Sequence, residues 1–222
     1  MSSYPMRPLL SALVLLSACH AHHAGHGGQD GYAHRFDDPQ KWAAVFDDPS
    51  RDAWQKPEEL LAALKLPKNA VVADVGAGTG YFTLRLARAL PAGKVYAVDV
   101  EPSMVEYTEK RARDAGFGNV QGVVASTNSP RLPGKVDLVL VVDTYHHVSN
   151  RLEYFDALRE QLRPGGRIAI VDYTMASPHG PPPEHRLSDE QVKAEMVAAG
   201  YPRVEEPLAL PHQYVLVFSP TR

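Results

Sequence analysis

The segment D-V-G-A-G-T-G at residues 74–80 is the feature that most constrains what this chain can fold into. It follows an apolar run at residues 71–75, of the kind that forms a parallel strand buried on both faces. A helical pattern follows at residues 81–90. The three glycines permit a tight turn and a close backbone approach to a ligand, which a Cβ would prevent. The pattern predicts a strand–turn–helix unit whose helix N-terminus presents N–H groups to an anion such as a carboxylate.

Strands and helices alternate through the rest of the chain. Short apolar runs predict further strands, and amphipathic stretches predict the helices between them. The expected strands lie at residues 94–100, 120–125, 136–142, 167–172, 203–210 and 214–218. The expected helices lie at residues 102–115, 152–162 and 188–199. This alternation predicts an α/β domain with a doubly wound, mostly parallel sheet and right-handed crossovers.

The 222 residues have room for one substantial domain, which we place at residues 67–222. Residues 34–66 are expected to be helical, with proline and two acids at residues 57–59 as a helix start. Leu60, Leu61 and Leu64 give that helix one apolar face. We expect residues 34–66 to pack over the core as a helical cap. The apolar anchors of the cap are Phe36, Trp42, Val45, Phe46 and Trp54.

The first residues have the pattern of an export signal. Arg7 precedes an apolar run at residues 9–16 that is too short to span a bilayer, and small residues follow. Leu16-Ser17-Ala18-Cys19 resembles the bacterial lipobox, in which the cysteine is lipidated. That resemblance implies a signal peptide at residues 1–18 and a periplasmic lipoprotein of the cell envelope, anchored to the membrane only through Cys19. The alternative is a chance apolar N-terminus in a cytosolic protein.

Residues 19–33 are rich in histidine and glycine and predict a flexible tether. His20, His22, His23 and His26 suit Zn, Cu or Ni, so weak metal capture is the alternative. No acid or available thiolate fixes a coordination geometry there, and we predict no metal site.

The net charge of −3 and the absence of a basic stripe give no reason to expect nucleic acid as a partner. They favour a small-molecule partner. Composition does not determine the oligomeric state.

Asp99 ends the second expected strand, where an acid can accept hydrogen bonds from the two hydroxyls of a ribose. A nicotinamide site would use the same architecture with the spacing G-x-G-x-x-G. Tyr81 follows Gly80, so that spacing fails here and G-x-G-x-G fits instead. The dinucleotide pattern also leaves Asp74 unexplained.

These motifs resemble the class I S-adenosylmethionine (SAM) dependent methyltransferases, particularly the type 11 group with ubiquinone and menaquinone C-methylating enzymes. The matching stretches are residues 71–83, 95–104, 136–148 and 162–172, and the resemblance covers residues 56–219. It implies a seven-stranded sheet whose last strand is antiparallel and inserted between its neighbours. It also implies SAM as the cofactor, with the glycines at the methionine part and Asp99 at the ribose.

The adenine end of the expected site departs from the family. An acid often follows the third strand in the family, but Ala125-Ser126-Thr127-Asn128 stands here. Backbone groups or short polar side chains would then contact the adenine. Met104 lies against the adenine face in one interpretation and is a plain core methionine in the other. The expected cofactor residues are Asp74, Gly76, Ala77, Gly78, Gly80, Asp99, Val100, Met104, Ser126 and Asp143.

The acceptor is expected beyond the carboxyl ends of the strands. This rule selects residues 143–147 after the central strand, and Asp172 and Tyr173 after the fifth. His146 or His147 is a candidate general base, because histidine titrates near neutral pH. Tyr145, with Tyr173, Trp42 and Trp54, would line an aromatic acceptor pocket or be plain core. His185 and Arg186 would reach over this pocket or stand at the start of the next helix.

The sequence thus predicts a SAM-dependent methyltransferase that acts on an unidentified small-molecule acceptor. One alternative is a catalytically inactive lipoprotein of the same fold that binds metal through its histidine-rich tether. A nicotinamide-dependent reductase is a third possibility, which Tyr81 disfavours.

Overall fold

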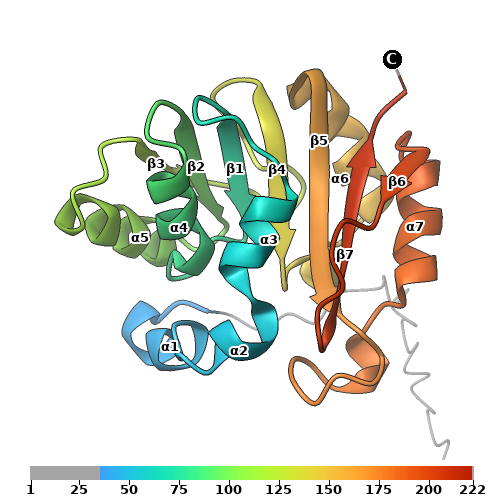
Figure 1. The fold of residues 1–222 in the computed structure, drawn as a ribbon, viewed down its shortest axis with the longest axis horizontal. Coiled ribbons are helices and arrows are strands. Elements are labelled where there is room, and N and C mark those ends of the chain that lie inside the picture. The colour runs from blue at the N-terminus through green and yellow to red at the C-terminus, as the bar shows by residue number, and fades with distance from the viewer. Residues whose placement is uncertain (1–35, 222) are drawn as a thin grey trace, which may run out of the picture.

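The computed structural model describes residues 36–221. Its centre is a seven-stranded sheet with the order β3-β2-β1-β4-β5-β7-β6 (Figure 1). β7 runs antiparallel to both β5 and β6, and the pairs among β1 to β5 are parallel. The doubly wound sheet with an inserted antiparallel strand is confirmed. The strands are β1 (Val71–Val75), β2 (Lys94–Asp99), β3 (Val120–Val124), β4 (Val136–Val142), β5 (Leu162–Tyr173), β6 (Arg203–Glu205) and β7 (Gln213–Ser219).

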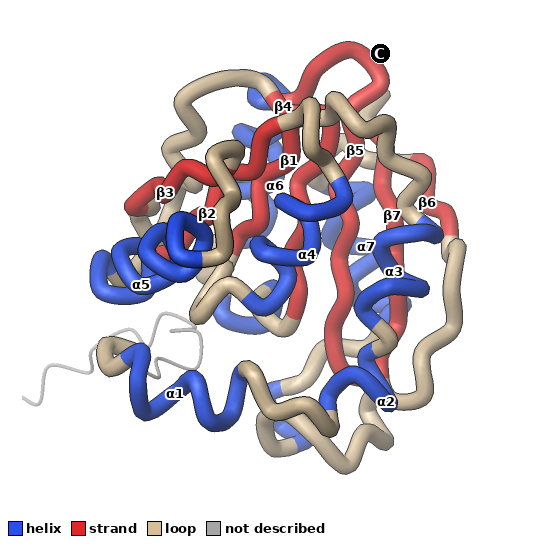
Figure 2. Tube along the Cα trace, turned by 60° about the vertical axis from the view of Figure 1, so that its left-hand side comes forward, coloured by secondary structure: helices blue, strands red, loops and turns tan. Residues whose placement is uncertain are grey.

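Helices cover both faces of this sheet (Figures 1 and 2). The α-helices are α1 (Pro39–Phe46), α2 (Arg51–Gln55), α3 (Pro57–Ala63), α4 (Tyr81–Ala89), α5 (Pro102–Asp114), α6 (Arg151–Leu158) and α7 (Asp189–Ala198). Three short 3₁₀ helices complete the secondary structure: η1 (Tyr145–His147), η2 (Arg159–Gln161) and η3 (Pro183–His185).

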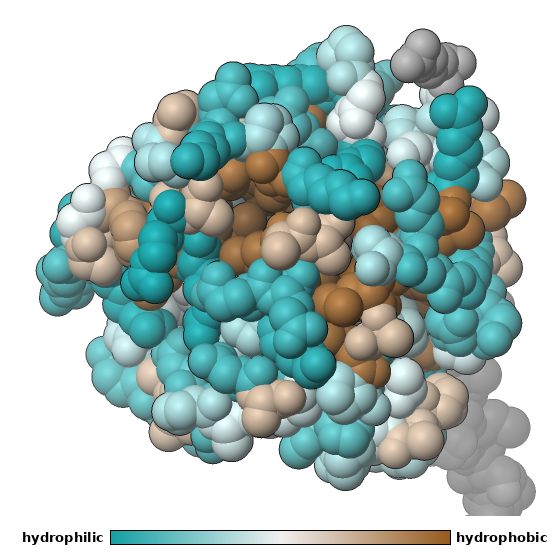
Figure 3. Space-filling model, in the orientation of Figure 1, coloured by the Kyte–Doolittle hydropathy of each residue, from teal (hydrophilic) through white to brown (hydrophobic). Residues whose placement is uncertain are grey.

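Each face of the sheet buries its own apolar cluster. Phe155 of α6 and Met196 of α7 belong to one cluster, and Leu60 of α3 and Leu86 of α4 belong to the other. Each such side chain contributes about 1.5–3 kcal/mol when it is fully buried. The outer surface over α3 and α4 is mainly hydrophilic, with apolar patches near the middle of the view (Figure 3). Both faces of the sheet are therefore covered by helices, and the ends of its strands are available to form a binding site.

Two strand boundaries differ from the sequence-based expectation by more than one residue, and the helix expected at residues 152–162 ends at Leu158. The fifth strand begins at Leu162, because Leu162 pairs with Val136 before the register shifts and Arg167 pairs with Leu138. The sixth strand ends at Glu205 and does not extend to residue 210. Pro207 follows closely and has no N–H to donate to a strand ladder. The strands expected at residues 71–75 and 136–142 are confirmed in full.

The helical segment near the N-terminus divides into two parts. α1 and α2 lie across the carboxyl ends of the strands (Figures 1 and 2). α3 packs on a face of the sheet, where Leu60 and Leu61 join the core. We therefore use the name cap for residues 36–55 alone.

Polar contacts tie the cap to the domain at several points. The Asp47 carboxylate lies 2.7 Å from the Arg111 guanidinium of α5, and Asp52 lies 2.9 Å from Arg85 of α4. The hydroxyl of Tyr81 also donates to Asp52. Exposed ion pairs contribute little singly, so the cap is held by the sum of several weak contacts.

Among residues 36–221 no helix combines the length and apolar character needed to cross a bilayer. The expected signal peptide, the lipobox cysteine and the histidine-rich tether lie outside the described residues.

A carboxyl group is buried at the centre of the sheet. Asp74 of β1 is 3% exposed, and its Oδ2 accepts a 2.6 Å hydrogen bond from the Thr83 hydroxyl of α4. Burial raises the pKa of Asp74 from 3.8 to about 6, and the neighbouring Asp99 adds to the effect. The ionised form is therefore the costly one in the folded state.

We predict that Asp74→Asn stabilises the ligand-free protein at neutral pH. The pKa is higher in the folded state, so the stabilising contribution exists below pH 3.8 and is lost as the pH rises to about 6. The loss at pH 7.5 is up to about 3 kcal/mol. Urea denaturation should show a gain of about 1–3 kcal/mol for the variant at pH 7.5 and a much smaller gain at pH 4.5. A variant less stable than wild type at pH 7.5 would contradict this, with Asp114→Asn as the exposed control.

Candidate functional site

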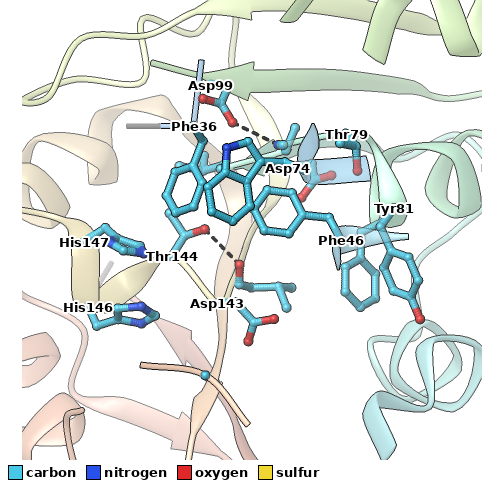
Figure 4. Close-up of a pocket in the computed structure, with 18 of the residues that line it drawn as sticks. Phe36, Phe46, Asp74, Thr79, Tyr81, Asp99, Asp143, Thr144, His146 and His147 are labelled. Carbon is cyan, nitrogen blue, oxygen red and sulfur yellow. Dashed lines mark hydrogen bonds between the residues drawn. The ribbon is translucent and has the colours of Figure 1, made fainter. Parts of the chain in front are cut away.

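A cavity of about 890 Å³ opens at the carboxyl ends of the central strands, beneath the cap. Its walls come from the glycine turn and the start of α4, the end of β2, residues 125–127 after β3, the loop after β4, and residues 179–182 after β5. Figure 4 shows how side chains from these segments and from the cap converge on one space. This is the place where parallel α/β sheets bind ligands.

The glycine turn has a backbone that other residues do not fit. Gly76, Gly78 and Gly80 have φ values of +77°, +53° and +92°. A Cβ on Gly76 would lie 2.1 Å from the Thr144 Oγ1. The N–H groups of Gly76 and Ala77 both donate to the Val98 carbonyl of β2, at 2.8 and 3.0 Å. The turn is thus fixed against the neighbouring strand while its inner side faces the cavity.

Asp99 lies beside this turn, at the end of β2. Its Oδ2 accepts from the Gly78 N–H at 2.9 Å, and its Oδ1 accepts from the Glu101 N–H at 3.0 Å. Burial raises the pKa of the Asp99 carboxyl. Each oxygen keeps a lone pair for a further donor, so the carboxylate can accept bonds from a pair of ligand hydroxyls.

Thr79 provides an unused donor in the cavity wall. Its Oγ1 is buried and, among the described residues, has no hydrogen-bond partner. A buried polar atom without a partner costs about 1–3 kcal/mol. The hydroxyl stands just before the N-terminus of α4, where the helix dipole also favours an anion. A carboxylate bound here would satisfy both groups.

Asp143 links the cap to the sheet. Its carboxylate accepts hydrogen bonds from Gln55 Nε2 at 3.0 Å, Arg51 Nη2 at 3.2 Å and the Gln213 amide. Burial raises the pKa of Asp143 to about 6, although the nearby Arg51 opposes the change. Sequence analysis did not identify Arg51, Gln55 or Gln213, because a polar residue on a short helix or strand gives no pattern that distinguishes it from surface.

His146 and Asp172 form a buried pair, of which His146 lines the cavity and Asp172 does not. His146 Nδ1 lies 2.9 Å from both carboxylate oxygens, and the two side chains are 4% and 5% exposed. Asp172 also accepts from the backbone N–H groups of Tyr173 at 2.8 Å and His146 at 3.3 Å. The rings of His146 and His147 lie 4.2 Å apart, and both residues line the cavity.

Tyr145 requires a correction, since we expected it at the acceptor. It is fully buried, stacks on Phe155 with 5.1 Å between ring centroids, and donates from its hydroxyl to Glu195 at 2.8 Å. Successive side chains of η1 point in different directions, so Tyr145 enters the core while His146 and His147 face the cavity.

Some of the remaining expected cofactor residues line the cavity, and others are buried elsewhere. Ala77, Val100 and Ser126 line the cavity. Met104 is fully buried on α5 and does not line it. The structure therefore brings the expected cofactor residues together around the cavity, apart from Met104 and Gly80, which do not line it.

Aromatic side chains form the roof of the cavity. Phe36, Trp42 and Phe46 pack together, with ring centroids 4.8 Å apart for the first pair and 5.4 Å for the second. In Figure 4 Phe36 lies beside Asp99 and Phe46 lies near Asp74, and Phe46 is 3.3 Å from the position of a Cβ on Gly78. On the opposite part of the wall, Trp54 of α2 stacks on His179 at 4.5 Å.

The loop after β5 is held by one arginine. The Arg186 guanidinium donates to five backbone carbonyls, at 2.7–3.4 Å. They belong to Thr174, Met175, Ser177, His179 and Pro181. Arg186 therefore shapes the loop that carries His179 to the cavity. Ser188 is the N-cap residue of α7, since its Oγ accepts a hydrogen bond from the Gln191 N–H at 3.2 Å.

Within residues 36–221 no group of three or more histidine, cysteine, aspartate or glutamate side chains is placed to hold a metal ion.

Known proteins are similar to this chain in sequence and in fold. The methyltransferase domain family matches residues 66–206. A SAM-dependent methyltransferase from Aquifex aeolicus superimposes with a TM-score of 0.73 at 30% identity, covering 82% of this chain and 97% of that chain.

Curated relatives match a shorter stretch. The ubiquinone/menaquinone biosynthesis C-methyltransferase of Hahella chejuensis is 29% identical over 108 residues, which is 47% of this chain and 43% of that protein. The protein-L-isoaspartate O-methyltransferase of Aeropyrum pernix is 36% identical over 107 residues, which is 45% and 37%. This chain thus spans about two fifths of the length of these two relatives. The chain belongs to the methyltransferase domain family, and its fold is that of the SAM-dependent methyltransferases.

Proposed function

We propose that this protein transfers the methyl group of SAM to a small, planar, apolar acceptor bound beneath the cap. One observation carries the proposal: a single cavity joins the glycine turn and Asp99 to a compartment of aromatic rings and imidazoles. In Figure 4 His146 and His147 lie on one side of this space, and Asp99, Asp74 and Thr79 lie on another. SAM, when bound, supplies an activated methyl group on a sulfonium.

The residues present fit SAM. The glycine turn, the N-terminus of α4 and the unpartnered Thr79 hydroxyl suit the carboxylate of the methionine part. Asp99 suits the ribose hydroxyls. Asp74 and Asp143 are buried carboxyls with raised pKa values in the same wall. Their negative charge favours a ligand that carries a sulfonium and an ammonium group.

The acceptor compartment favours a neutral, flat molecule. Trp54, Tyr173 and His179 form one side, and Phe36 and His147 lie near each other on another. These rings exclude water and hold the acceptor close to the donor. Orientation of this kind supplies about 7–11 kcal/mol in favourable cases.

A role restricted to metal binding has no supporting observation in the part of the chain that the structure describes. We therefore do not propose it as a second function.

We also propose that the chain is exported and lipidated at Cys19. The support is the lipobox-like Leu16-Ser17-Ala18-Cys19 after a short apolar run. An enzyme placed there needs a supply of SAM in the envelope, because the cofactor is made in the cytoplasm.

The first prediction concerns cofactor binding. Isothermal titration calorimetry should show binding of SAM to the wild-type protein and at least tenfold weaker binding to Asp99→Asn, since hydrogen bonds to a charged acceptor contribute about 1.5–3 kcal/mol. Asp114→Asn, an exposed acid on α5, is the matched control and should bind as wild type. Absence of binding to the wild-type protein would refute the proposed function.

The second prediction concerns the loop after β5. Arg186→Lys keeps the charge but cannot donate to five carbonyls at once. Amide hydrogen exchange in residues 174–186 should become at least tenfold faster, which corresponds to about 1.4 kcal/mol, while SAM affinity changes less than twofold. Arg163→Lys is the control, because Arg163 pairs with Asp137 at the other end of the strands. Unchanged exchange in the Arg186 variant would show that the loop is held by other contacts.

The third prediction concerns Cys19. In a bacterial host that processes lipoproteins, labelled palmitate should be incorporated into the full chain and lost in Cys19→Ala. Equal labelling of both chains, or labelling of neither, would refute lipidation at this residue.

A further inference from the structure

We propose that the acceptor is a phenol and that His146 is the base that removes its hydroxyl proton, with Asp172 as a positioning residue. This inference rests on the proposed methyl transfer and assigns its substrate class. It is carried by the geometry of the pair and by the chemistry of the surrounding wall.

The hydrogen bonds of Asp172 fix the direction of the imidazole. Two backbone N–H groups and the His146 Nδ1 all point at this carboxylate, which is 3% exposed. An ionised carboxylate only accepts, so Nδ1 carries the proton of the neutral ring. The lone pair is then on Nε2, and no described group donates to Nε2. His146 lines the cavity and Asp172 does not, so the open side of the ring faces the ligand space.

A purely structural role explains less of this arrangement. η1 is already joined to β5 by the hydrogen bond from the His146 N–H to Asp172. An apolar residue would fill the same volume without placing a basic nitrogen beside a cavity. A carboxylate that contacts Nδ1 and sets the tautomer is instead what a general base needs.

The wall around His146 selects against charged acceptors. Arg51 is the only lysine or arginine among the described residues that line the cavity. It already donates to Asp143, Gln55 and the Phe46 carbonyl. An acceptor with a phosphate or carboxylate would find no available cation there, whereas a flat ring would contact the aromatic side chains.

A phenol combines a flat ring with a proton that must be removed. Its hydroxyl has an ordinary pKa of about 10, so little phenolate exists at neutral pH without a base. In the step, Nε2 of His146 takes the hydroxyl proton while the oxygen forms a bond to the methyl carbon. The bond from that carbon to sulfur breaks, and its electron pair stays on sulfur as a neutral thioether. Asp172 stabilises the imidazolium until the proton passes to water.

The test is a series of phenols of increasing acidity, from catechol to 4-nitrocatechol, with detection of the methyl ether by mass spectrometry. Wild type should methylate the weakly acidic members. His146→Gln should lose about 10²–10⁴-fold on them, the usual contribution of a general base. The same variant should lose less than tenfold on the nitro-substituted member, which is largely ionised before it binds. Asp172→Asn should show a smaller loss with the same dependence on acidity.

Controls and contrary results separate this inference from the proposed function. His185→Gln, an exposed histidine on η3, should behave as wild type. SAM titration checks that each variant is folded. If Asp172→Asn does not fold, the result for His146→Gln alone tests the role of His146. A loss in His146→Gln that is equal across the series, or no loss, would overturn the role of His146. Wild-type protein that binds SAM but methylates only amine or carbon acceptors would overturn the phenol assignment and leave the proposed function standing. If it binds no SAM, both fail.

Discussion

The site depends on one constraint, which is the contact between the glycine turn and the two strands beside β1. The turn is fastened to β2 through the Val98 carbonyl and lies so close to the loop after β4 that a Cβ on Gly76 would overlap Thr144. Because of this packing, Asp99 stands within hydrogen-bond distance of Gly78. A substitution in the turn would therefore disturb three segments at once, and with them the whole cofactor wall.

Buried negative charge is the second organising feature. Asp74, Asp99 and Asp143 lie around one cavity, and burial raises the pKa of each carboxyl. Ionised groups removed from water need compensating partners. The cap supplies some of them, since Arg51 and Gln55 donate to Asp143 from α2. A cationic cofactor would supply more, so the cap and the ligand would compensate the same charges.

The acceptor compartment is assembled from segments that are distant in the sequence. The stacked pair of Trp54 and His179 joins the cap to the loop after β5, and Arg186 holds that loop in shape. The cap and this loop are therefore in direct contact through the stacked rings. The cap and the loop after β5 together cover part of the cavity at the strand ends.

The sequence alone determined the parts of this protein that follow from local patterns. Apolar runs gave β1 and β4, and the glycine spacing gave the turn and the place of Asp99. Tertiary structure decided the rest. Tyr145 and His146 are adjacent, yet one enters the core and the other the cavity, and the Asp172 that orients His146 is 26 residues away. Gln55 and Gln213, 158 residues apart, meet on Asp143. Such pairings depend on long-range packing, which leaves no periodic signal in a single sequence.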